Sequence, residues 1–409
     1  MHNRHFRLDN TVQHYDWGSP TRIHELLGST PDGRPAAELW LGAHRSAPST
    51  VLDAAPGDVP EQVSLADLVQ GDPEGMLGRR VADAFGPRLP YLLKVLAADR
   101  ALSLQVHPRP HHARAGFNRE NLDGLPHGSP DRSFHDDQHK PEMVVALSQF
   151  EGLVGFRTPR AVLSLLDGLD GPLVATVRSV LAADRSARGI RAAFTGLVAS
   201  RHDAGTPAAL EASLESVRRR LDGGSPYERA DRTVMLLAEQ HPGDPGALVS
   251  LLLNRVTLEP GESLFIPAGV VHAYVSGLGI EVMASSDNVL RAGLTSKRVD
   301  EAALVECAVF EPSGPTVPTV TTSGDRGQVH TYRVPVEEFG LVVADVDEEE
   351  TLTFPSEGPR IVLCLDGKAV LHGTHDDLVL ARGESAFVPH AAGPLQVGGH
   401  GHVVCVWTP

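Results

Sequence analysis

The sequence lacks several features that would indicate a membrane protein or a nucleic-acid-binding protein. Aromatic residues make up only 5% of its 409 residues. No apolar run approaches the roughly 20 residues that a membrane-spanning helix needs. The longest basic run is the three arginines at 218–220, in a chain with 52 acidic and 36 basic residues. The composition therefore excludes a membrane span, and the net charge of −16 argues against an electrostatic footprint for nucleic acid.

Cysteine is equally scarce. The three cysteines, Cys307, Cys364 and Cys405, are odd in number and form no C-x-x-C pair. The first ten residues also lack the apolar core of a secretory signal peptide. We therefore expect a cytoplasmic protein that has neither disulfides nor a thiolate metal site.

The length of 409 residues and the 41% hydrophobic content fit two or three domains. Residues 1–157 contain short β-rich runs separated by glycine, proline and polar turns, and we predict an all-β unit there. Residues 158–250 are rich in alanine and leucine and predict helices, followed by strands in 251–316 and a second β unit in 317–409. The expected fold is mainly β with a helical insertion.

The clearest predicted helix follows Gly205. Thr206 is its expected N-cap and Pro207 its first helical residue, while Gly223 and Gly224 end it. The leucines at 210, 214 and 221 share one face, so the pattern predicts packing and no chemistry.

Two segments resemble each other: GESLFIPAGVVH from Gly261 and GESAFVPHAAGP from Gly383. The first resembles the second cupin motif, G-x5-P-x-G-x2-H, through Gly261, Pro267, Gly269 and His272, although Ser276 replaces the usual asparagine. The resemblance implies a jelly-roll β-barrel with metal ligands pointing inward.

The second copy departs from this motif. Ala391 replaces the glycine, and Ala392 and Gly393 lie where a histidine would be expected. We therefore interpret residues 317–409 as a metal-free cupin-like domain, and residues 1–157 and 251–316 as the two parts of a catalytic cupin domain.

A metal in the first barrel needs further ligands near His272. Gln105 and His107 are two residues apart in LSLQVHP, so a strand would point both to one face, and Glu142 precedes another apolar strand. These four side chains would form a site of nitrogen and oxygen ligands that suits Zn²⁺. A single histidine among 20 is more often a surface residue, and His111–His112 fit the start of a surface helix.

A longer segment is more specific. HAYVSGLGIEVMASSDNVLRAGLTSK, residues 272–297, closely resembles the signature of type I mannose-6-phosphate isomerases, with Ser296 in place of a usual proline. FHDDQHKPE, residues 134–142, resembles the family's Y-x-D-x-N-H-K-P-E, with Phe134 and Gln138 as the departures. The resemblance extends over essentially the whole chain. It implies interconversion of mannose 6-phosphate and fructose 6-phosphate, one zinc ion per chain, a phosphosugar as the partner and a monomer.

The resemblance also implies site residues. The metal ligands would be Gln105, His107, Glu142 and His272; the catalytic residues Arg291, Lys140, His139, Glu281 and Asp287; and the substrate-binding residues Trp17, Lys94, Ser103, Tyr274 and Lys297. Several have structural alternatives: Trp17 could belong to the core, Tyr274 could close the barrel, and the acidic pair could form salt bridges.

An enediol isomerisation needs a proton carrier, an electrophile and a phosphate anchor. Arg291, which is always cationic, would stabilise the enediolate. Lys140 and His139 lie beside Glu142 in the sequence and are candidate proton carriers, with Glu281 and Asp287 as rivals. The phosphate would meet Lys94, Lys297 or Ser103, and the chain has no glycine-rich phosphate loop of the Walker type.

Two other classes of function stay open at this stage. A cupin dioxygenase or another metal-dependent sugar isomerase would use iron or manganese, but its usual three-histidine set is not visible, because Gln105 stands where a histidine is expected. A non-catalytic sugar-binding cupin would not require Arg291 and Lys140, which are both present.

Overall fold

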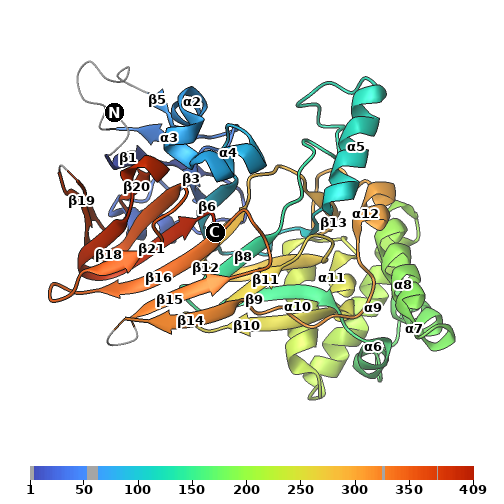
Figure 1. Ribbon diagram of the computed structural model, residues 1–409. Helices are drawn as coiled ribbons and strands as arrows, with labels where there is room; N and C mark the ends of the chain where they lie inside the picture. The colour runs from blue at the N-terminus through green and yellow to red at the C-terminus, as the bar shows by residue number, and fades with distance from the viewer. Residues whose placement is uncertain (1–3, 53–62, 325–327, 375) are drawn as a thin grey trace.

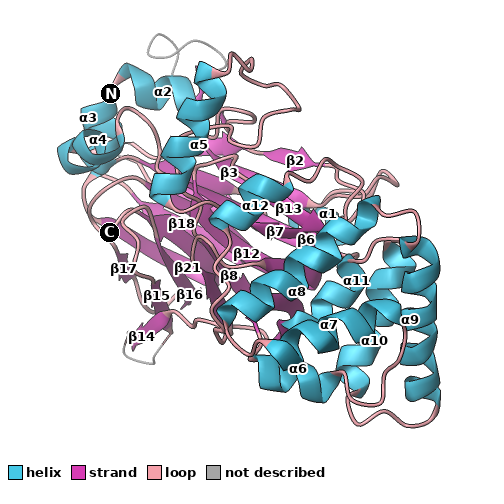
Figure 2. Ribbon diagram, turned by 90° about the vertical axis from the view of Figure 1, so that its right-hand side faces the viewer, coloured by secondary structure: helices cyan, strands magenta, loops and turns pink. Residues whose placement is uncertain are grey.

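The computed structural model describes residues 4–52, 63–324, 328–374 and 376–409. Two antiparallel sheets lie side by side, and a group of helices covers one end of the molecule (Figures 1 and 2). Within the described part of the chain, no helix combines the length and the apolar character needed to cross a membrane. The mainly β fold with helices in 158–250 is the one expected from the sequence.

The first sheet has ten strands and carries the site described below. They are β2 (Thr11–Gln13), β3 (Glu38–Gly42), β6 (Tyr91–Ala98), β7 (Leu104–Val106), β8 (Glu142–Ala146), β9 (Phe150–Phe156), β10 (Leu253–Leu258), β11 (Ser263–Ile266), β12 (His272–Ala284) and β13 (Leu290–Gly293).

Strand β12 joins the two sides of this sheet. Its first residues pair with β7 and β9, and residues from Gly277 onward pair with β6 and β8. The change of partners occurs at a register shift between Tyr274 and Ser276. Gly277 has φ 129°, and a Cβ there would lie 2.7 Å from the Phe150 ring, so the corner requires glycine.

The second sheet has eleven strands. They are β1 (Phe6–Asp9), β4 (Thr50–Val51), β5 (Val63–Ser64), β14 (Thr319–Ser323), β15 (Val329–Arg333), β16 (Gly340–Val346), β17 (Leu352–Phe354), β18 (Arg360–His372), β19 (Leu378–Ala381), β20 (Ser385–Val388) and β21 (Leu395–Trp407). β1 pairs with β20, so the beginning of the chain completes the sheet formed mainly by its end (Figure 1).

The prediction that residues 1–157 form an all-β unit is wrong, because five helices interrupt the strands. They are α1 (Arg22–Leu27), α2 (Leu65–Gly71), α3 (Pro73–Leu77), α4 (Arg79–Phe85) and α5 (Pro110–Leu122). Local signals favour them: the Ser64 side chain accepts a hydrogen bond from Asp67 N, and Asp72 does the same for Gly75 N ahead of Pro73. These five helices lie between strands and do not alter the mainly β class.

The helices of the segment 158–250 are α6 (Pro159–Leu165), α7 (Pro172–Ala183), α8 (Ala187–Ala199), α9 (Thr206–Asp222), α10 (Glu228–Gln240) and α11 (Gly246–Val249). Two 3-10 turns, η1 (Ser200–His202) and η2 (Ser250–Leu252), lie between and after them. The predicted N-cap at Thr206 is wrong: helix α9 begins at Thr206 itself, and its hydroxyl donates to Ser200 O at 2.5 Å. Helix α12 (Glu301–Cys307) follows the first sheet, and the 3-10 turn η3 (His390–Ala392) follows β20.

One apolar core joins these helices to the first sheet. Phe156 of β9 meets Phe194 of α8 edge to face at 5.3 Å and stacks on Phe310 at 5.6 Å. All three rings are buried. Such aromatic packing fixes the helices against the strands that hold the site.

The two sequence repeats occupy matching places in the two sheets. Ile266 of β11 pairs with Glu142, and Val388 of β20, which is equivalent to Ile266, pairs with Arg360. Arg360 is fully buried and donates to Pro389 O and Gly393 O. Counted from the shared glycine, the position of His272 is occupied by Pro394, and the expectation that Ala392 and Gly393 lie there is wrong. A guanidinium in place of a carboxylate cannot bind a cation, which favours the metal-free interpretation of the second repeat.

Candidate active site

Three buried side chains meet at the inner face of the first sheet. His107 follows β7, Glu142 begins β8 and His272 begins β12. Each is at most 1% exposed. One ligand atom from each lies within 4.8 Å of the others, and this group could hold a metal ion. Distant segments therefore converge as the motifs predicted.

Hydrogen bonds orient both imidazoles. His107 Nδ1 donates to Asn288 O at 2.7 Å, and His272 Nδ1 donates to Val270 O at 2.9 Å. With Nδ1 protonated, the Nε2 atom of each neutral ring carries a lone pair, the arrangement of a metal-ligating histidine. Burial lowers the pKa of His107 to about 4, which favours this neutral form.

The two Nε2 atoms face one carboxylate. His107 Nε2 lies 3.2 Å from Glu142 Oε1, and His272 Nε2 lies 3.3 Å from Glu142 Oε2. Burial disfavours the charge of Glu142, but the positive charge of Lys140, whose Nζ lies 2.8 Å away, helps to hold the pKa of its carboxyl well below the usual value. Lone pairs that face one another repel unless a cation lies between them, so the donor set fits a divalent metal.

Gln105 completes the predicted ligand set. It pairs in register with both His272 and Arg291, and its carboxamide nitrogen lies 3.2 Å from His272 Nε2. Rotation of the amide by half a turn would present its oxygen instead, and amide oxygens serve as ligands for hard or borderline cations. All four predicted ligands are thus neighbours.

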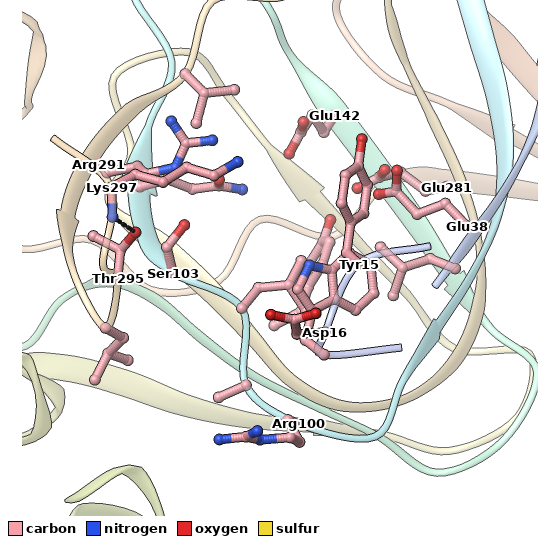
Figure 3. A pocket seen from close by; sticks show the side chains of 18 of the residues that line it. Tyr15, Asp16, Glu38, Arg100, Ser103, Glu142, Glu281, Arg291, Thr295 and Lys297 are labelled. Atoms are coloured by element: carbon pink, nitrogen blue, oxygen red, sulfur yellow. Dashed lines mark hydrogen bonds between the residues drawn. The ribbon is translucent and has the colours of Figure 1, made fainter. Parts of the chain in front are cut away.

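A cavity of about 690 Å³ opens onto this group. Glu142 and Gln105 lie in its wall, and most of the other predicted site residues share that wall (Figure 3). They are Trp17, Lys94, Ser103, Lys140, Tyr274, Glu281, Asp287, Arg291 and Lys297. The volume is ample for a hexose phosphate.

His139 is the exception among the predicted residues. Its Nε2 lies 2.5 Å from Glu338 Oε1, in the segment between β15 and β16, and its side chain is not part of the cavity wall. The neighbouring Lys140 turns the other way, with Nζ 2.8 Å from Glu142 Oε1. Successive residues of an extended segment point to opposite sides, and this alternation excludes His139 as a cavity base in this conformation.

Lys94 carries the only charge in the otherwise apolar strand β6. Its Nζ lies 3.3 Å from Glu38 Oε1 and 3.1 Å from Glu281 Oε2, and all three side chains are buried. Burial alone would lower the pKa of Lys94, but the two carboxylates outweigh it and raise the pKa above the usual value. Because two carboxylates already neutralise its charge, Lys94 is poorly suited to bind a phosphate dianion.

Arg291 and Lys297 form a cationic end of the cavity, beside Ser103 and Thr295 (Figure 3). Among the described residues, no carboxylate forms an ion pair with either cation. Burial, opposed by Tyr15, lowers the pKa of Arg291, and burial followed by the charge of Arg291 lowers the pKa of Lys297. Two uncompensated cations side by side form a site for an anion.

The acidic candidates occupy different surroundings. Burial is the main cause that raises the pKa of Glu281, although Lys94 opposes it. Asp287 lies nearer solvent, 3.4 Å from His44 Nε2 and 3.2 Å from Arg45 Nε. Tyr274 is buried against the Phe150 ring at 5.1 Å and also lines the cavity, so it serves both the core and the wall.

Sequence reasoning missed several residues of the wall. Glu38 and Trp40 lie two apart on β3 and face the cavity, joined by a hydrogen bond from Trp40 Nε1 to Glu38 Oε2 at 2.7 Å. The alternation in ELWLG could have indicated them. Gln240 and Asp244, from the helical segment, also line the cavity, and no pattern in the sequence links them to it.

Two family models match the chain. The model described as phosphomannose isomerase type I, catalytic domain, matches residues 5–159, and the mannose-6-phosphate isomerase cupin domain matches residues 328–408. The mannose-6-phosphate isomerase of Escherichia coli (strain K12) is 38% identical over 404 residues, which are 98% of this chain and 99% of that protein. The isomerase of Rattus norvegicus is 31% identical over 94% of this chain and 93% of its own length.

Solved structures agree with these matches. A zinc-bound mannose 6-phosphate isomerase superposes with a TM-score of 0.87 at 35% identity and covers 99% of both chains. A variant of the phosphomannose isomerase from Salmonella typhimurium gives a TM-score of 0.87 at 34% identity, again over 99% of both chains. Since sequence and structure match along nearly their whole lengths, this chain belongs to the type I mannose-6-phosphate isomerase family.

Proposed function

We propose that this chain catalyses the reversible interconversion of mannose 6-phosphate and fructose 6-phosphate with one zinc ion. The observation that carries the proposal is the convergence of His107, Glu142 and His272 beside a cavity whose other end holds two cations without an ion-pair partner among the described carboxylates. Family membership supports the same reaction, because the relatives are named for it.

Zinc suits the donor set on chemical grounds. The unprotonated Nε2 atoms of His107 and His272, the Glu142 carboxylate and the Gln105 amide oxygen would hold it, without any thiolate. The ion, when bound, would supply a Lewis acid that polarises a sugar oxygen.

The charges in the cavity orient the substrate. Lys297, Ser103 and Thr295 lie together and would bind the phosphate, a dianion above pH about 6. C1 and C2 of the open-chain sugar would then lie toward Glu142 and Glu281, on the opposite side of the cavity in Figure 3. Arg291, which pairs in register with the predicted metal ligand Gln105, would stabilise the negative charge of the enediolate.

The reaction moves protons and needs no external oxidant or reductant. A base removes the proton from C2 of mannose 6-phosphate while O1 gains a proton, which gives an enediol. Return of a proton to C1, with loss of the proton on O2, gives fructose 6-phosphate. Glu281 is our preferred carrier between C2 and C1, because burial raises the pKa of its carboxyl toward the working pH. Lys140, bound to Glu142, is the rival carrier.

A coupled assay of fructose 6-phosphate formation tests the proposal. We expect turnover of mannose 6-phosphate that a chelator abolishes and added zinc restores. A protein with bound zinc that does not isomerise the sugar would instead indicate a binding cupin. Recovery with iron or manganese alone would indicate a different metal-dependent enzyme.

Two variants, Glu281→Gln and Lys140→Met, distinguish the two candidate proton carriers. The measurement is the exchange of the C2 hydrogen of mannose 6-phosphate with deuterium from solvent. If Glu281 carries the proton, Glu281→Gln abolishes exchange while zinc stays bound. Retention of exchange in Glu281→Gln, together with its loss in Lys140→Met, would assign the step to Lys140.

A further inference from the structure

The helical segment 158–250 contacts the cationic end of the cavity, and the ion pair between Arg201 and Asp244 is part of this contact. We propose that Asp244 and Arg201 are positioning residues that hold residues 292–297, and with them Lys297, in the conformation that binds the substrate phosphate. The inference rests on the proposed function, and it gives the helical segment a part in substrate binding.

The segment they hold is strained. Leu294 has φ 54°, and it is the one non-glycine residue with a positive φ among the described residues. A branched aliphatic side chain rarely adopts this backbone region, so surrounding contacts must impose it. Leu294 is 1% exposed and follows strand β13, three residues before Lys297.

Contacts from the helical segment lie on both sides of Leu294. Before it, Arg201 of η1 donates from Nη2 to Ala292 O at 3.1 Å. After it, Asp244 Oδ2 accepts a hydrogen bond from Thr295 N at 3.2 Å. The two side chains also pair with each other at 3.5 Å, and each is less than a fifth exposed. A mostly buried ion pair thus bridges the strained residue.

The contacts made by Asp244 extend through Thr295 to Lys297, the proposed phosphate-binding residue. Thr295 Oγ1 accepts a hydrogen bond from Lys297 N at 3.1 Å, so a shift of Thr295 would move Lys297. Close packing adds to the restraint: a Cβ on Gly246, which follows Asp244 by two residues, would lie 3.0 Å from Leu294 N. The backbones of the two segments are therefore in direct contact.

The end of α10 also contacts the loop between β6 and β7, on the other side of the proposed phosphate site. Gln240 Oε1 accepts from Ala101 N at 2.8 Å, and Gln240 O accepts from Arg100 at 2.8 Å. Ser103 follows Ala101 by two residues in the same loop. One turn of the helical segment therefore touches both segments that supply the phosphate-binding side chains.

A purely structural role is the competing interpretation, because Asp244 Oδ1 also accepts from Gly246 N at 2.7 Å at the start of α11. The two roles differ in what they affect. Loss of the contact between Asp244 and Gly246 would lower only the stability of the fold. Loss of the hydrogen bond between Asp244 and Thr295 would weaken phosphate binding in the folded holoenzyme.

The experiment compares wild type with Asp244→Ala in the zinc-loaded enzyme. We expect Asp244→Ala to raise the KM for mannose 6-phosphate at least tenfold, equivalent to about 1.4 kcal/mol, while kcat changes less than threefold. Inorganic phosphate, measured by calorimetry, should bind more weakly by a similar factor. Zinc content should stay at one ion per chain.

Asp184→Ala is the matched control. Asp184 is also in the helical segment and accepts hydrogen bonds from Ser186 N, the N-cap residue of α8, and from Arg188 Nε, but it does not line the cavity. It should lower thermal stability and leave KM unchanged. An equal rise of KM in both variants, or an unchanged KM and phosphate affinity in Asp244→Ala, would overturn the proposal.

Asp244→Asn covers the case in which Asp244→Ala does not fold, since it keeps one oxygen acceptor and should give a smaller rise of KM. The phosphate measurement separates this inference from the proposed function. If wild type lacks isomerase activity, the function is wrong, and the difference in phosphate affinity between wild type and variant still decides the role of Asp244.

Discussion

Lys94 is the residue at which burial and charge compete most directly. It lies between Glu38 and Glu281 and packs over the Trp40 ring at 5.3 Å. One cation between two carboxylates leaves this wall with a net negative charge, in contrast to the Arg291–Lys297 end. The side chains of the cavity are therefore polarised, and under the proposed function this polarity would favour one orientation of the sugar phosphate.

We predict that Lys94→Met destabilises the fold by about 3–5 kcal/mol at neutral pH, because it leaves two buried carboxylates without their cation. The pKa of Glu281 is already raised in the folded protein, and loss of Lys94 would raise it further. A carboxyl whose pKa is higher in the folded than in the unfolded state destabilises the fold increasingly as the pH rises above its unfolded pKa of about 4.5. The loss of stability in Lys94→Met should therefore be larger at neutral than at acid pH.

Urea denaturation between pH 4.5 and 8 measures this effect. Lys368→Met is the matched control, since Lys368 is exposed on β18 and should change stability by less than about 0.5 kcal/mol. A loss of stability in Lys94→Met that does not depend on pH would contradict the electrostatic explanation.

Under the proposed function, the charge of Arg291 takes part in the reaction. We predict that Arg291→Ala lowers kcat at least about a hundredfold, the scale of one lost electrostatic contact in a transition state. Zinc should stay bound, because the arginine is not a ligand. Arg291→Lys, which keeps the charge without the planar fork, should recover part of the rate. Near-normal turnover of the alanine variant would remove Arg291 from the catalytic set.

At the scale of elements, the pairing of β1 with β20 ties the two ends of the chain together. Phe6 is 2% exposed and stacks on Phe387 at 6.4 Å. Arg7 pairs with Glu384 at 2.5 Å on the outer face. The buried ring contributes more than the exposed ion pair, because exposed pairs rarely exceed about 1 kcal/mol.

We therefore predict that Phe6→Ala lowers the free energy of unfolding by about 3 kcal/mol or more. Since β1 belongs to the other sheet and Phe6 does not line the cavity, kcat/KM under folding conditions should not change. Phe6→Leu, which preserves most of the volume, should lose less than half as much stability. A fall in kcat/KM at full folding would indicate that β1 also supports the active site.

The difference between local and long-range signals explains what the sequence could predict. Alternation placed Gln105 on a strand, and the Gly261 motif placed His272 at the start of another. The structure places His139 outside the cavity wall, because proximity in sequence to Glu142 does not show which way a side chain turns. The contacts of Glu338 with His139 and of Asp244 with Thr295 join single polar residues far apart in sequence, and no periodic pattern marks them.

At the scale of the whole molecule, the metal group joins segments that are distant in the chain. The ligands extend from Gln105 to His272, and the helical segment 158–250 lies between them in sequence. A bound ion stabilises the folded state by mass action, because the unfolded chain does not bring these ligands together. The same ion that serves the reaction would therefore also hold the helical segment onto the sheet.

We predict that removal of zinc by a chelator lowers the midpoint of thermal unfolding. At free zinc a thousandfold above its Kd, the lost stabilisation is about 4 kcal/mol. His272→Ala is the control, since it removes one ligand: its midpoint should lie near that of the zinc-free wild type and should not respond to chelator. The response of Gln105→Ala to chelator should lie between those of wild type and His272→Ala. The reason is that an amide oxygen binds zinc more weakly than imidazole does, so the loss of Gln105 should weaken zinc binding less than the loss of His272. Equal midpoints for wild type with and without zinc, at full occupancy by elemental analysis, would show that the ion does not couple these segments.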